Sequence, residues 1–106
     1  TITLSNSVSN QMHGIVLVFS RYSDGASQNY HFNTFFVSKY QISKHGGCGH
    51  TFILTDDGDF GLMACKYLYI HDDKIVGNDI NNTTGTGTSG ITYTNNGFVL
   101  RYVIGV

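Results

Sequence analysis

The sequence lacks proline, tryptophan and glutamate altogether, and alanine occurs only at positions 26 and 64. Alanine and glutamate are among the best helix formers, so their scarcity argues against a helical protein. Charged residues make up 12% of the chain, about half the usual ~25%. The six Lys and Arg residues are never adjacent and the net charge is −1, which argues against nucleic-acid binding. No apolar run approaches the ~20 residues of a membrane span, so membrane insertion is not expected.

The abundant residues favour β-structure. Val, Ile, Thr, Tyr and Phe together supply 42 of the 106 residues, and β-branched and aromatic side chains are enriched in strands. A chain of this length is expected to form one domain, which comprises residues 1–106. The chain begins at Thr1 rather than Met, and we expect it to be a piece of a longer protein.

The stretch KYLYIHDDKIVGN at 66–78 predicts a β-hairpin, because its strands flank the turn-like sequence His71-Asp72-Asp73-Lys74. Residues 20–29, 43–50 and 81–90 are predicted to be loops, and no helix is predicted. The pattern indicates an antiparallel, jelly-roll-like β-sandwich of about eight strands. The other predicted strands are 1–5, 15–19, 30–40, 51–55, 60–71, 91–94 and 98–106, with turns at Asp24-Gly25, 56–59 and Asn95-Asn96-Gly97.

Three segments carry apolar side chains on both faces, at 15–19, 62–64 and 98–104. A single small domain has too little interior to bury all of these side chains. Large exposed apolar patches usually mark interfaces, so we expect a homo-oligomer. Arg101 lies in the last segment and is expected to be paired or at an interface, with a structural role, because an unpaired buried charge is costly.

Potential metal ligands occur in two places. The HGGCGH segment at 45–50 offers three ligands for zinc, but the spacing matches no structural zinc pattern and a flexible loop is favoured. The aspartates at 56–59 and 72–73 offer oxygens for calcium, but their order differs from the EF-hand loop and hairpin turns are favoured. Cys48 and Cys65 are favoured as two free thiols, and a disulfide between them is left open. No metal or cofactor is predicted.

Three blocks of sequence, taken in order, carry a family resemblance. They are GIVLVFSRYSDGASQNYHFNTFFVSK at 14–39, KYLYIHDDKIVGN at 66–78 and GITYTNNGFVLRYVIGV at 90–106. Together they resemble the C-terminal domains of tail or baseplate proteins from phages of Gram-positive bacteria, lactic-acid bacteria among them. The resemblance spans most of the chain, from about Gly14 to Val106.

The resemblance implies the head of a trimeric receptor-binding protein, a β-sandwich at the tip of a phage tail that binds saccharides of the host cell wall. The implied partners are host cell-wall polysaccharide, two further copies in a homotrimer, and other tail or baseplate proteins reached through a preceding segment. The implied location is the tail tip of the virion, after synthesis in the bacterial cytoplasm.

Two clusters of side chains are candidates for saccharide binding. Tyrosine and histidine rings present flat faces to sugars, and Asp and Asn side chains hydrogen-bond to hydroxyl groups. Turn formation and core packing are the alternative roles for each cluster. The first cluster comprises Tyr22, Asp24, Asn29, Tyr30 and His31. The second comprises His71, Asp72, Asp73 and Asn78.

A polysaccharide-cleaving tail enzyme and a structural trimerisation knob are the alternatives to a binding domain. All seven acidic residues are aspartates, and most of them lie in predicted turns. No Ser-His-Asp order or nucleophile elbow is present, and no catalytic residue is predicted.

Overall fold

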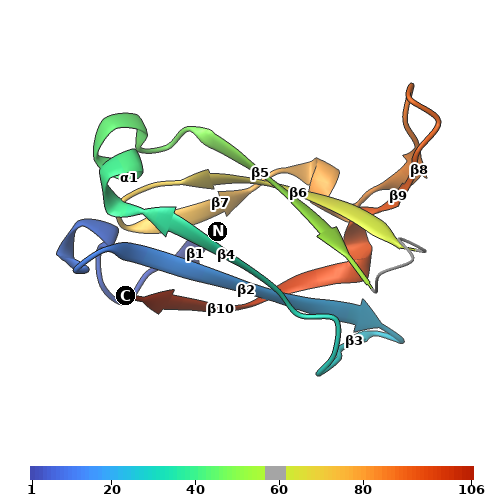
Figure 1. Cartoon of the computed structure of the whole chain (residues 1–106), viewed down its shortest axis with the longest axis horizontal. Helices are drawn as coiled ribbons and strands as arrows, with labels where there is room; N and C mark the ends of the chain where they lie inside the picture. The colour runs from blue at the N-terminus through green and yellow to red at the C-terminus, as the bar shows by residue number, and fades with distance from the viewer. Residues whose placement is uncertain (57–61) are drawn as a thin grey trace.

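The computed structural model describes residues 1–56 and 62–106. It is mostly β, with 52% of residues in strands, antiparallel sheets and one α-helix in the described part. Figure 1 shows two sheets facing each other, with the helix at one end and the β8–β9 hairpin projecting at the other. The elements are β1 (Ile2–Thr3), η1 (Val8–Asn10), β2 (Gly14–Ser23), β3 (Ala26–Ser27), β4 (Asn33–Ser38), α1 (Lys39–His45), β5 (Gly49–Thr55), β6 (Met63–Ile70), β7 (Lys74–Gly77), η2 (Asp79–Asn82), β8 (Thr84–Thr86), β9 (Thr92–Thr94), η3 (Asn95–Gly97) and β10 (Phe98–Gly105), where η marks a 3₁₀ helix.

The first sheet has the strand order β1-β7-β6-β5. In the second sheet β2 pairs with β10 along one side and with β3 and then β4 along the other. Strands β8 and β9 form a separate pair. The prediction of a mostly β, antiparallel structure is therefore confirmed, whereas the jelly-roll connectivity and the homotrimer stay predictions.

The core lies between the two sheets and follows the alternation of side chains along each strand. Within one chain only one face of the 15–19 segment is buried, because Val16 and Val18 remain partly exposed on the other face. Aromatic rings join the sheets, since the Phe19 ring centroid lies 6.0 Å from that of Phe52. The buried apolar residues are Val8, Ile15, Leu17, Phe19, Val37, Ile42, Phe52, Leu54, Ala64, Leu68, Ile70, Ile75 and Phe98.

The sheets are tied together along one side and open along the other. On the tied side, Asn33 Nδ2 of β4 donates to the Thr55 carbonyl at 3.0 Å, and Thr55 N–H donates to Asn33 Oδ1 at 3.4 Å. The Asn33 amide thus bonds to the edge of β5 as another strand would. On the open side lie β1 and β10, which do not pair with each other within the described residues. We call the gap between β1 and β10 the seam.

The predicted hairpin at 66–78 is confirmed, since β6 and β7 pair antiparallel with Ile70 opposite Ile75. The Asp24-Gly25 turn is also confirmed, because Ser23 pairs with Ala26 around it. Asp24 and Gly25 have φ values of 56° and 74°, as a two-residue type I′ turn requires. The predicted 56–59 turn, except for Asp56, and the first two residues of the predicted 60–71 strand lie outside the described residues.

The absence of helix was predicted wrongly, because α1 occupies 39–45. The predicted 30–40 strand therefore ends at Ser38, whose hydroxyl accepts a hydrogen bond from the Tyr40 N–H and caps the helix. Lys44 and His45 in the last turn suit the negative end of the helix dipole. Ile42 is buried and anchors the helix to the core.

Three further local predictions were wrong. The 95–97 segment is a 3₁₀ helix and not a hairpin turn, because β9 pairs with β8 while β10 pairs with β2. The 81–90 loop contains β8, and the 20–29 loop contains the end of β2 and all of β3.

Two buried asparagine side chains extend the ladder of β6 beyond the end of β7. Asn81 Oδ1 accepts from the Tyr67 N–H at 2.6 Å, and its Nδ2 donates to the Tyr67 carbonyl at 2.9 Å. Asn95 Oδ1 accepts from the Cys65 N–H at 2.7 Å. These amides satisfy main-chain groups of β6 that β7 is too short to reach.

Candidate functional site

Arg101 occupies a β-bulge in the last strand. Leu100 pairs with Phe19 and Tyr102 pairs with Val18, so Arg101 is the extra residue between them. The bulge reverses the side-chain alternation of β10, because Leu100 packs against the core while Tyr102 is 51% exposed. Bulges commonly redirect a side chain near a binding site. Here the bulge carries the Arg101 guanidinium across β2.

The guanidinium of Arg101 fastens the segment between β3 and β4. Its Nη1 donates to Ser20 Oγ at 3.0 Å, to the Gln28 carbonyl at 3.2 Å and to Asn29 Oδ1 at 3.1 Å. Its Nη2 lies 3.5 Å from the Tyr102 hydroxyl, and the Arg101 Cζ lies 5.5 Å from the Tyr102 ring centroid. All of these partners are neutral, so the positive charge of Arg101 remains available to a ligand.

Part of the first predicted cluster gathers at this arginine. Residues 28–32 separate the β3 and β4 pairings with β2, and His31 has a left-handed φ of 54°. Tyr30 is 47% exposed. Its ring is edge-on to the His31 ring, and the two ring centroids lie 4.9 Å apart. Asn29, Tyr30 and His31 therefore follow one another beside Arg101. Asp24 lies apart, exposed at the tip of the β2–β3 turn.

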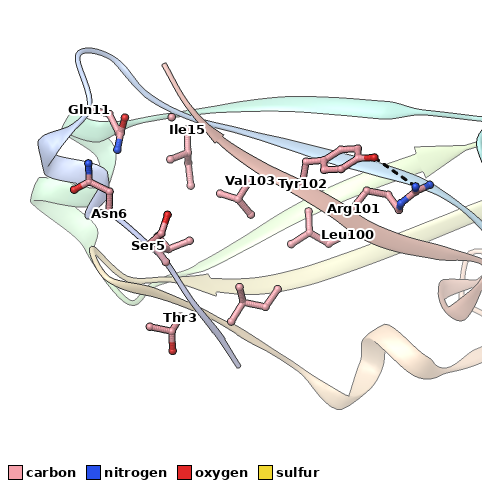
Figure 2. Close-up of a pocket in the computed structure, with 12 residues that line it drawn as sticks. Thr3, Ser5, Asn6, Gln11, Ile15, Leu100, Arg101, Tyr102 and Val103 are labelled. Carbon is pink, nitrogen blue, oxygen red and sulfur yellow. Dashed lines mark hydrogen bonds between the residues drawn. The ribbon is translucent and has the colours of Figure 1, made fainter.

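Arg101 also lines a cleft along the seam. This seam cleft has a volume of about 320 Å³, within the range of small-ligand sites. Figure 2 shows Ser5, Asn6 and Gln11 near one end of the cleft and Arg101 and Tyr102 near the other. The lining residues are Ile2, Thr3, Leu4, Ser5, Asn6, Gln11, Ile15, Leu100, Arg101, Tyr102, Val103 and Gly105.

This arrangement suits a neutral or acidic polyol. Hydroxyl, amide and guanidinium groups offer hydrogen bonds in several directions, and apolar side chains such as Leu100 and Val103 offer contact to C–H groups. The exposed Tyr102 ring provides a flat face at the mouth. Arg101, Tyr102, Asn6 and Gln11 were not predicted as site residues. The one signal for them was an isolated arginine in an apolar strand, which was assigned a structural role.

The second predicted cluster does not lie in one place. Asp72 Oδ1 accepts from the Ser9 N–H at 2.8 Å, and Asp72 Oδ2 accepts from Ser9 Oγ at 3.0 Å, so this carboxylate secures the N-terminal segment. Asn78 follows the last residue of β7, so it lies roughly 13 Å along the strand from the β6–β7 turn. Its Oδ1 accepts from the Ile80 N–H at 3.0 Å, and its Nδ2 donates to the Tyr69 hydroxyl at 3.1 Å.

The remaining members of that cluster sit on the β6–β7 turn. Asp73 is exposed, and its carbonyl accepts from the Leu4 N–H at 2.9 Å. The His71 N–H donates to the Lys74 carbonyl at 2.9 Å, which closes the turn. Saccharide binding by these four residues stays a prediction, although Asp72 and Asn78 have structural partners already.

The described residues contain no group of three His, Cys, Asp or Glu side chains placed to hold a metal ion. Cys48 is exposed, Cys65 is partly buried, and both are free thiols. The His50 side chain of β5 stacks on the Phe52 ring, with the two ring centroids 6.4 Å apart. Burial lowers the pKa of the His50 imidazole. Its Nε2 is buried without a hydrogen-bond partner, which is compatible with a neutral ring.

Among residues 1–56 and 62–106, no helix has the length and apolar character needed to cross a bilayer. No protein-family model, curated protein or solved structure matches the chain at a significant level.

Proposed function

We propose that this chain is the head domain of a phage tail receptor-binding protein, which recognises a host cell-wall saccharide without catalysis. The sequence resemblance motivates the proposal, and the bulge at Arg101 is the observation in the structure that carries it furthest. The saccharide lies in the seam cleft against Arg101, with the Tyr102 ring at the mouth, and a longer saccharide extends past β10 to the Arg101 guanidinium. Asn29, Tyr30 and His31 extend the site on the far side of Arg101.

Binding at such a site is weak for one saccharide unit, because a shallow polar cleft gains little beyond the cost of ordering the ligand. A homotrimer, with many trimers at one tail tip, raises the overall affinity by orders of magnitude through multivalency. Jelly-roll connectivity and contacts of a preceding segment with other tail proteins belong to the same proposal.

The outward face of the second sheet supports the homotrimer. Its cross-strand row of Phe36, Val16 and Ile104 is apolar, and Phe36 and Ile104 are 56% and 47% exposed. A patch of this kind on a small domain is typical of an interface between copies. The same face favours the second candidate, a structural trimerisation knob that binds no saccharide.

The test is binding of the fluorescently labelled chain to a panel of Gram-positive cells and to their purified wall polysaccharides. The variants are Arg101→Lys, which keeps the charge but removes the planar fork, and Arg101→Ala. Lys74→Ala removes an exposed charge on β7 and is the matched control. Loss of hydrogen bonds from a charged group should weaken single-site affinity roughly 10- to 100-fold for Arg101→Ala.

Strain-selective binding that free polysaccharide competes away, and that Arg101→Ala but not Lys74→Ala reduces, is the expected result. No binding to any strain by a folded trimer would favour the structural knob. Release of reducing ends from the polysaccharide would instead establish an enzyme and contradict the proposal.

A further inference from the structure

Lys66 occupies an inward position of β6 where the alternation calls for an apolar side chain. Ala64, Leu68 and Ile70 share this face and are buried in the core. Lys66 is only 7% exposed, and its Nζ donates to the Asn81 carbonyl at 3.0 Å. An ammonium group has three donors, so two remain for other partners.

Within residues 1–56 and 62–106, no acidic side chain pairs with this buried amine. Within the described residues no carboxylate lies within 4.0 Å of Lys66 Nζ, and burial alone lowers the pKa of the amine to about 8. Lysine is almost never fully buried unless it is paired. Loss of the proton or binding of an anion would each relieve the cost of burying this charge.

The Lys66 side chain lines a hollow at the end of the sandwich that is separate from the seam cleft. We call it the Lys66 hollow, and its volume is about 270 Å³. The other lining residues are Tyr22, Asn82, Asn96, Phe98 and Val99. The hydroxyl and the two side-chain amides can donate hydrogen bonds, and no acidic side chain is among the lining residues.

A second cation lies beside the same hollow. Arg21 Nη1 donates to the carbonyls of Tyr22 at 2.6 Å and Gly97 at 2.7 Å, which places the guanidinium next to the strands that form the rim. Besides Lys66 of β6, the titratable side chains at this end of the sandwich include Arg21 and Tyr22, which lie near the end of β2. Arg21 does not itself line the hollow, but it is bonded to the carbonyl of Tyr22, which does, and to that of Gly97, which lies between two lining residues.

We propose that the Lys66 hollow binds an anionic oxygen group, a carboxylate or phosphate, which accepts hydrogen bonds from Lys66 Nζ and from the amides of Asn82 and Asn96. Such an anion supplies a charge partner for the buried amine, and the described residues provide none. The group belongs either to a free inorganic anion or to an acidic substituent of a saccharide. The proposal does not depend on saccharide binding in the seam cleft, from which the hollow is distinct.

The test uses the whole chain, titrated with inorganic phosphate, acetate, glucose 1-phosphate and uncharged glucose, and followed by NMR shifts of backbone amides. Lys66→Met preserves the length of the side chain and removes the charge, and Lys74→Met is the exposed control. Lys66→Met should weaken anion binding roughly 10- to 100-fold, whereas Lys74→Met should leave it unchanged.

Saturable shifts at residues 96–99 caused by phosphate or acetate would support a free-anion site. Shifts caused by glucose 1-phosphate alone would support an acidic-saccharide site. The proposal is overturned if none of the charged probes binds up to tens of millimolar, if glucose binds equally well, or if Lys66→Met binds as the wild type does. Should Lys66→Met fail to fold, the wild-type Lys66 pKa, measured from its ¹³Cε shift, must rise when the bound probe is present, and an unchanged pKa overturns the proposal.

Discussion

Replacing Asn95 with alanine tests whether buried amide side chains hold the unpaired edge of β6. Asn95 is 2% exposed, and three elements meet at its side chain. Its Oδ1 accepts from the Cys65 N–H of β6 at 2.7 Å, and its Nδ2 donates to the Ile80 carbonyl of η2 at 2.9 Å. A weaker contact joins Nδ2 to Thr83 Oγ1 at 3.4 Å.

Asn95→Ala removes both strong hydrogen bonds and leaves the Cys65 N–H and the Ile80 carbonyl without these partners. The Ile80 carbonyl still accepts from the Thr83 N–H at 3.2 Å and from Thr83 Oγ1 at 2.8 Å, so only the Cys65 N–H is left unsatisfied. One unsatisfied buried polar group predicts a loss of about 1–3 kcal/mol. Domains of this kind have a total stability of about 5–15 kcal/mol, so the loss is a large fraction of it.

Urea unfolding followed by circular dichroism measures the change directly, because a lower midpoint with an unchanged slope reports lower stability. Asn96→Ala is the matched control, since Asn96 is the exposed neighbour and its replacement should change stability by less than about 0.5 kcal/mol. A loss below about 1 kcal/mol for Asn95→Ala, on the scale of ordinary surface changes, would refute this account of the β6 edge.

Three other outcomes are expected. Gly14→Ala should lower the free energy of unfolding by at least about 2 kcal/mol, because the new methyl group would overlap the Val37 carbonyl oxygen. Gly87→Ala is the control in the same urea assay and should change it by less than about 0.5 kcal/mol. In phosphate-free buffer the wild-type stability should rise as pH increases from about 8 towards 10.5, because the buried Lys66 amine loses its proton before it would in the unfolded chain, and Lys66→Met should not show this rise. Phe36→Asp should dissociate the proposed homotrimer in light-scattering measurements, whereas Tyr40→Asp on α1 should not. A stable wild-type monomer at micromolar concentration would contradict the trimer.

Local pattern predicted the strands well where chain neighbours also pair in space. The 66–78 hairpin was predicted because alternation and an acidic turn agree over a short stretch, and β6 and β7 pair with each other across that turn. Tertiary contacts decided the failures. Asn95-Asn96-Gly97 has strong hairpin chemistry, yet β10 pairs with the distant β2. The α1 helix has one buried apolar residue, Ile42, and therefore no clear helical period.

The candidate site was less accessible to prediction. Asn29, Tyr30 and His31 were predicted because they are consecutive in the chain. Arg101 was missed as a site residue because a bulge is a property of the register between strands, and β10 lies about 80 residues from β2 in sequence. Asp72 looked like a ligand for sugar, but its Ser9 partner lies 63 residues away and no local pattern indicates it.

The bulge at Arg101 also affects the tendency of the chain to aggregate through its strand edges. In the part of the chain that the structure describes, β10 is an edge strand, and an edge exposes a row of main-chain donors and acceptors to strands of other molecules. Proteins usually protect such edges with charge or proline, and this chain has little of the former and none of the latter. The irregular register at 100–102 interrupts the row and places an arginine within it. Edge-to-edge aggregation is thereby hindered at the strand where a low net charge would otherwise permit it.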